Sequence, residues 1–121
     1  MALRAVRGAI QVDADERDHV LEASAELLRT VLERNGLTAD DLVSVFFTAT
    51  PDITSEFPAY ATRSMLGITD LPLMCAVEMS VAGAMPRVLR IMAHAETDLS
   101  RSEVRHVYLR GAAALRTDLP Q

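Results

Sequence analysis

Two arginines in apolar, strand-like surroundings are the residues of this sequence whose chemistry stands out. Arg90 lies within the apolar run at 88–95, and Arg7 lies within a β-like segment at 3–12. A guanidinium cannot deprotonate to escape desolvation, so inside a mostly buried strand it needs an anion or a ring of acceptors. For both segments the alternative is an exposed strand whose arginine lies in solvent.

Four more polar side chains are candidates for the same site. Arg116 follows the apolar residues at 112–115, and Glu78 and Tyr108 are the polar residues best suited to accompany the arginines. Arg63 falls on a short predicted helix, where a solvent-facing arginine is the simpler interpretation. Because guanidinium forks match carboxylates in bidentate geometry, this set predicts a pocket for a small dicarboxylate.

Other reactive chemistry is not indicated. The three histidines are scattered, and none has the second ligand close by in the chain that a zinc site needs. The glycines form neither a Walker loop nor a dinucleotide fingerprint. Cys75 has apolar neighbours, and such a cysteine is more often a small buried hydrophobe than a nucleophile. We therefore expect no metal and no cofactor.

The composition limits the class of protein. Of the 121 residues, 50% are hydrophobic but only 4% are aromatic, so we expect one domain, 1–121, with an aliphatic core. The net charge of −5 argues against nucleic acid or an anionic membrane as partner. The single cysteine excludes an internal disulfide framework, and no apolar run is long enough to span a bilayer. We expect a cytoplasmic protein, because the start of the chain also lacks the apolar core of a signal peptide.

The arginine-bearing segments are predicted to be strands. Within 88–95 the odd-numbered residues form a uniformly apolar face, so Arg90 projects to the opposite side. Within 3–12 Arg7 stands among small side chains. Gly8 weakens this strand and indicates a bulge or the close approach of another backbone or a ligand.

A long amphipathic helix is predicted between these strands. Asp13 is the expected N-cap, with Glu16 in the capping-box position three residues later. Apolar residues then recur every three or four positions until Asn35 and Gly36, which are expected to end the helix. The charges on its other faces indicate a solvated surface.

The remaining segments predict more strands and one short helix. Residues 42–49 are nearly continuously apolar, which favours a central strand buried on both faces. The order of elements predicts an α+β (α/β-like) domain, with a mixed β-sheet packed against one long helix. The further expected elements are a short helix from 57–59 to 66–67, strands at 71–75, 104–109 and 112–116, and a mobile polar tail at 117–121.

Four segments resemble the AroH class of chorismate mutases, the small ones that are not all-helical. Each segment is weakly specific alone, but together they cover nearly the whole chain, in order and without a large insertion. They are Arg4–Ala9; Phe47–Asp52 with Phe57–Ala59 and Arg63; Cys75–Met79 with Gly83 and Arg90; and Arg105–Leu109 with Leu115 and Arg116.

The resemblance implies a homotrimer in which sheets from three subunits form a central pseudo-α/β barrel, with active sites in clefts between adjacent subunits. The implied reaction is the Claisen rearrangement of chorismate to prephenate, on the route to phenylalanine and tyrosine. This reaction is unimolecular and needs no metal, nucleophile or cofactor.

The resemblance also implies roles for individual residues. Arg7 and Tyr108 would hold a substrate carboxylate, and Arg90 would reach both a carboxylate and the ether oxygen. Glu78 would accept the substrate hydroxyl. The further substrate contacts implied are Cys75 beside Glu78, Phe57, Leu73 and Leu115 as an apolar wall, and Arg63 and Arg116 as positive charge at the rim.

This sequence departs from the family pattern at three positions. Tyr60 stands where a basic residue is common, and Thr117 replaces a proline in the tail. Met74, which we also expect to contact substrate, stands where a small polar residue is common. None of the three removes a proposed catalytic group, so they bear on substrate affinity and on closure of the tail.

Two alternatives remain at this point. A trimeric enamine/imine deaminase of the Rid type would share the architecture and also uses a strand arginine on a carboxylate, but its motifs match less well. A non-catalytic trimeric module would grip an anionic metabolite without turning it over.

Overall fold

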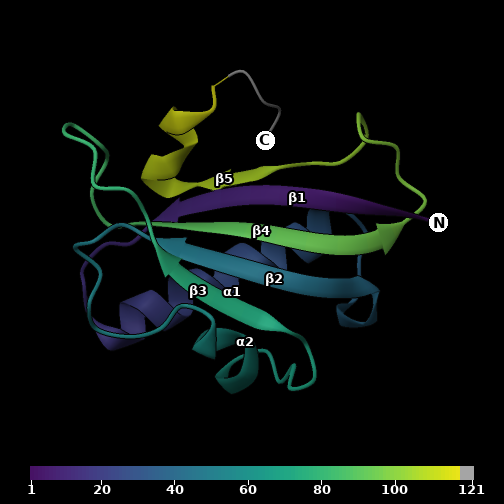
Figure 1. Ribbon diagram of the computed structural model, residues 1–121, viewed down its shortest axis with the longest axis horizontal. Coiled ribbons are helices and arrows are strands. Elements are labelled where there is room, and N and C mark those ends of the chain that lie inside the picture. Colours follow the sequence, from purple (N-terminus) through teal and green to yellow (C-terminus); the bar gives the residue numbers. More distant parts are fainter. Residues whose placement is uncertain (118–121) are drawn as a thin grey trace.

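The computed structural model describes residues 1–117 and contains one five-stranded sheet with a long helix on one face (Figure 1). The predicted tail lies outside the described residues, apart from Thr117. In chain order the elements are β1 (Ala2–Gln11), α1 (Arg17–Arg34), η1 (Ala39–Asp41), β2 (Leu42–Ala49), α2 (Tyr60–Ser64), β3 (Leu73–Val77), β4 (Val88–Thr97), β5 (Val107–Leu109) and η2 (Arg110–Leu115).

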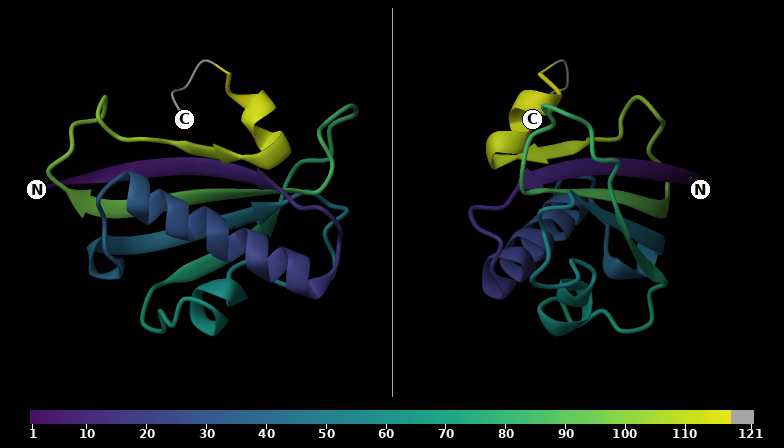
Figure 2. Two further views of the ribbon diagram at one scale, coloured as in Figure 1. Left: turned by 180° about the vertical axis from the view of Figure 1, so that it is seen from behind. Right: turned by 60° about the vertical axis from the view of Figure 1, so that its left-hand side comes forward.

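The sheet is mixed, as predicted, and has the strand order β3-β2-β4-β1-β5. The central strand β4 runs antiparallel to both β1 and β2, while β3 pairs parallel with β2 and β5 pairs parallel with β1. The short helices lie at opposite edges, α2 beside β3 and η2 beside β5 (Figures 1 and 2). The strand that carries Arg90 is therefore the middle of the sheet, not an edge.

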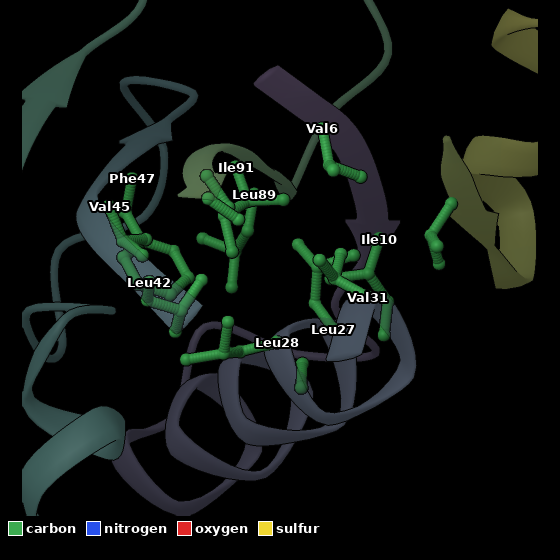
Figure 3. Packing of buried hydrophobic residues seen from close by; sticks show 14 of the residues in the cluster. Val6, Ile10, Leu27, Leu28, Val31, Leu42, Val45, Phe47, Leu89 and Ile91 are labelled. Carbon is green, nitrogen blue, oxygen red and sulfur yellow. The ribbon is translucent and has the colours of Figure 1, made fainter. Parts of the chain in front are cut away.

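The core lies between α1 and one face of the sheet. In β4, Leu89 and Ile91 are buried on this face, because every second side chain of a strand points the same way. Leu27, Leu28 and Val31 of α1 point into the same cluster (Figure 3). Full burial of one such side chain stabilises the fold by about 1.5–3 kcal/mol.

The long helix begins later than its sequence predicts. Its N-cap is Glu16 and no side chain caps it, so the prediction of Asp13 as N-cap with a capping box was wrong. The acidic residue with a structural role here is Asp15, which accepts hydrogen bonds from the backbone of Thr54 and Ser55 at 3.1 Å. These bonds tie the loop before α1 to the loop after β2.

The C-terminal end of α1 matches its prediction. Asn35 is the C-cap, and Gly36 follows with φ +61°. Asn35 is buried, and its side chain exchanges two hydrogen bonds with the backbone of Arg105, at 2.7 and 2.9 Å. The helix end thereby anchors the segment that leads into β5.

Two other predictions need correction. Strand β2 is not buried on both faces, because Phe46 is 39% exposed on the side away from α1, while Phe47 is 1% exposed. The predicted strand at 112–116 is instead the 3₁₀-helix η2, which packs Ala112 against Tyr108. None of the helices in residues 1–117 has the length and apolar character that a bilayer crossing requires.

Candidate active site

The proposed catalytic residues gather on the sheet face opposite α1. Arg90 on β4 lies between Thr48 of β2 and Ala9 of β1 in the strand register. Arg7 precedes Ala9 by two positions on β1 and so points to the same side as Ala9. The alternation that buries Leu89 in the core thus places Arg90 on the open face.

Glu78 meets Arg90 directly. The Nε of Arg90 donates a hydrogen bond to Oε1 of Glu78 at 3.2 Å, and the Thr48 hydroxyl donates to Oε2 at 2.7 Å. The backbone N–H of Glu78 also donates to the carbonyl of Ala49 at 2.9 Å. Within residues 1–117 the Arg90 guanidinium makes this one hydrogen bond, so its terminal nitrogens are available to a ligand.

A pocket of about 190 Å³ opens beside this pair. Tyr108 of β5 contributes one side of it and is only 4% exposed. The Arg116 guanidinium lies 6.0 Å from the centre of the Tyr108 ring, and Leu115 packs on the same small cluster. The pocket is lined by Arg7, Gly8, Phe46, Thr48, Arg90, Ile91, Met92 and Tyr108.

The other expected substrate contacts lie around a second, larger pocket of about 750 Å³. This pocket lies between α2 and β3 and shares no lining residue with the smaller one. The Tyr60 ring contacts two cations there. The guanidiniums of Arg17 and Arg63 lie 5.8 and 5.7 Å from its centre. The expected residues that line it are Phe57, Arg63, Leu73, Met74 and Cys75.

Cys75 does not lie on the same face as Arg90. It pairs with Phe47 in the register and packs against the main core, so its side chain faces α1. Burial raises the pKa of the Cys75 thiol, although a hydrogen bond with the backbone of Ala59 partly offsets this. The thiol therefore stays protonated near neutral pH, and it is a poor nucleophile.

Two polar residues near the site were not anticipated. Thr48 orients Glu78, and the only sequence signal for it is that it lies two positions after Phe46 and so shares the open side of β2. His106 accepts a hydrogen bond from the backbone N–H of Arg7 on its Nδ1, at 3.0 Å. No sequence signal indicates this contact, because the two residues are 99 positions apart. The described part of the chain holds no group of three or more His, Cys, Asp or Glu side chains that could bind a metal.

Comparison with known proteins shows the family and the fold of this chain. The family "Chorismate mutase type I" matches residues 3–119. Chorismate mutase AroH of Thermus thermophilus is 46% identical over 118 residues, which is 97% of this chain and 96% of that protein. Chorismate mutase AroH of Bacillus subtilis (strain 168) is 36% identical over 119 residues, which is 98% of this chain and 94% of that protein. The solved chorismate mutase from Clostridium thermocellum superposes with a TM-score of 0.89 at 39% identity, covering 92% of this chain and 98% of that one.

The family match and the full-length relatives thus identify this mixed sheet with one long helix as an isomerase of aromatic amino acid biosynthesis. The chain belongs to the type I chorismate mutase family, the AroH class, and its activity is the conversion of chorismate to prephenate. The deaminase and the non-catalytic module are therefore set aside as accounts of its activity.

Proposed function

We propose that this chorismate mutase works in the cytoplasm as a homotrimer whose active sites lie between subunits, with Arg90 at the ether oxygen of chorismate. The observation that carries this proposal is the Arg90–Glu78 pair beside a small pocket that also contains Arg7 and Tyr108. Chorismate is a dianion with one hydroxyl group, so it matches two or more guanidiniums and one carboxylate acceptor.

Arg90 acts on the charge that develops during the reaction. In the rearrangement the ether C–O bond breaks ahead of formation of the new C–C bond, so negative charge grows on the ether oxygen. A guanidinium held beside that oxygen stabilises the transition state more than the ground state, which raises the rate. The Nε bond to Glu78 fixes the plane of the guanidinium and leaves its terminal nitrogens for the oxygen.

The other residues hold the substrate in its reactive shape. Arg7 and Tyr108 bind a carboxylate, and Glu78 accepts the hydroxyl hydrogen bond while Thr48 keeps the Glu78 carboxylate in place. Restricting a flexible dianion to its compact conformer supplies part of the rate acceleration without any covalent step. Next to Tyr108, Leu115 contributes to the apolar wall, and Arg116 supplies positive charge at the rim.

The trimer completes the site by joining its two halves. Here the Arg90 half denotes the group around the smaller pocket, and the Phe57 half denotes Phe57, Arg63, Leu73, Met74 and Cys75. In one chain the two halves line separate pockets. This separation supports a site in which one subunit supplies the Arg90 half and its neighbour supplies the Phe57 half. Exposed apolar side chains support this assembly, since Met74 is 60% and Val77 is 70% exposed in the single chain.

Two measurements test the proposal. Purified protein should deplete chorismate absorbance as prephenate appears, and light scattering should give three times the mass of one chain. A well-folded trimer without turnover would leave only metabolite binding and contradict the catalytic roles. An active monomer would contradict the shared site.

A further inference from the structure

The pairing of β1 with β5 ends at a histidine ring instead of a backbone carbonyl. The parallel register runs from Gly8 with Val107 to Ile10 with Leu109. One step before it, the Arg7 N–H donates to Nδ1 of His106 at 3.0 Å. The ring therefore serves as the acceptor for the backbone of the residue whose guanidinium belongs to the Arg90 half.

We propose that His106 is a positioning residue, whose neutral ring holds the Arg7 segment of β1 and whose protonation releases it. This inference rests on the proposed role of Arg7 in binding a substrate carboxylate. A protonated imidazole has no acceptor nitrogen, so Nδ1–H would face the Arg7 N–H, donor against donor. The hydrogen bond would be lost, and the Arg7 backbone would no longer be fixed where its side chain lines the smaller pocket.

The charges around His106 oppose its protonation. Partial burial of the ring lowers its pKa, and the positive charges of Arg7 on β1 and Arg116 after η2 lower it further. Among residues 1–117, no carboxylate lines the neighbouring pocket, whose remaining lining consists of apolar and basic residues. The other charged or titratable groups that line this pocket with His106 are Arg4, His94 and Arg101.

The pH dependence follows from the sign of this shift. Because the pKa of His106 lies below its ordinary value, the ring is neutral at and above neutral pH and the Arg7 bond is present there. The activity profile should be flat through neutrality, since the rearrangement transfers no proton. Below pH ~6.5, the ordinary histidine pKa, kcat/KM should fall as the ring gains its proton. The fall should appear mainly in KM, because Arg7 binds ground state and transition state alike.

Two variants of His106 distinguish the role of its hydrogen-bond acceptor from the effect of its protonation. His106→Asn places Oδ1 near the position of Nδ1 and cannot titrate, so the variant should keep the neutral-pH activity and lose the acid decline. His106→Phe removes the acceptor, so KM at neutral pH should rise about two- to tenfold, the size of one lost hydrogen bond. His94→Gln is the matched control and should keep the acid decline. NMR titration of the wild-type protein should move the His106 ring and the Arg7 amide with one common pKa.

The outcomes are distinguishable from failure of the proposed function. Absence of chorismate turnover at every pH would contradict the proposed catalytic roles of Arg90, Glu78 and Arg7, and this inference with them. An active enzyme whose acid decline persists in His106→Asn would assign the decline to another group and overturn the role of His106. An active wild-type enzyme that stays fully active while NMR shows His106 protonated would overturn it as well.

Discussion

At the residue scale, Arg90 and Glu78 restrain each other. One carboxylate oxygen accepts from Arg90, and the other accepts from Thr48. The Arg90 side chain is 44% exposed, so this ion pair contributes little to the free energy of unfolding. The ion pair instead orients the Arg90 guanidinium. A guanidinium already held in one plane need not reorganise when charge develops next to it.

Removal of Arg90 should therefore affect turnover far more than removal of another cation nearby. We expect Arg90→Ala to lower kcat by about 10²–10³ or more, which is the usual effect of deleting one preorganised donor. Arg63→Ala is the matched control, because Arg63 lies over the Tyr60 ring at the larger pocket. Steady-state kinetics with chorismate measures both, and equal kcat values would contradict the assigned roles.

Alternation of side chains was enough to predict the face of Arg90. The same pattern could not predict its partners, because Thr48 meets Glu78 across 30 positions and Arg7 meets His106 across 99. Such contacts depend on strand order and register, which local periodicity does not determine. The separation of Cys75 from Glu78 has the same cause, since neighbours three positions apart lie on opposite faces of a strand or beyond its end.

At the element scale, β1 and β5 approach closely at one glycine. A Cβ built on Gly8 would lie 2.6 Å from the Val107 carbonyl oxygen and 3.1 Å from Leu27 and Ile91 side-chain atoms. The oxygen belongs to the backbone and cannot move without shifting β5. The expectation of a close approach at Gly8 is thus confirmed, with a neighbouring strand as the partner.

Gly8→Ala should therefore loosen β5. We expect a loss of unfolding free energy of about 1–3 kcal/mol, as for overpacking in a core, together with weaker substrate binding because Tyr108 lies on β5. Thermal unfolding and amide hydrogen exchange at 107–109 would measure these effects. Gly67→Ala serves as the control: φ is +69° there and nothing lies within 4 Å, so strain is expected without faster exchange in β5. Unchanged exchange in Gly8→Ala would contradict the expectation.

A second element-scale prediction concerns Asp15, which joins two loops. Burial alone would raise the pKa of Asp15, but hydrogen bonds from Ser55 and Thr54 outweigh it and lower the pKa. A carboxylate with a depressed pKa stabilises the fold above its unfolded pKa, and this contribution disappears as the pH falls through the folded value. Asp15→Asn should thus lower the melting temperature by a few degrees at neutral pH, and by less at a pH below the folded pKa of Asp15. An equal loss at both pH values would contradict the ionised role.

The 3₁₀-helix η2 shows where local patterns stop being informative. A short apolar run at 112–116 fits a strand as well as a helical turn, so periodicity alone could not decide. The turn is made at Arg110, which has φ +53° although it is not glycine. Its guanidinium is paired with Glu26 at 3.0 Å and with Asp13 at 3.9 Å, long-range contacts that hold this backbone in place.

At the scale of the whole molecule, the two separate halves make a test of subunit sharing possible. Arg90→Ala disables the Arg90 half, and Leu73→Asp would place a charge in the wall of the Phe57 half. If each site draws one half from each of two neighbours, coexpression of these two inactive chains should restore about a quarter of the sites in a randomly mixed trimer. Chorismate turnover by the coexpressed protein, against each variant alone, measures this. Sites contained within one chain would stay inactive in every mixture.

The central place of β4 has a consequence for how the chain acquires its structure. The strands on either side of it, β1 and β2, are synthesised first and have no direct pairing with each other. Until residues 88–97 leave the ribosome, α1 can cover only β1 and the separate β2–β3 pair, so the core stays open for most of synthesis. Closure then requires one long-range insertion, which is a slow step that exposes strand edges. The catalytic arginine arrives on the segment that completes the sheet, so no shorter nascent chain can be both folded and active.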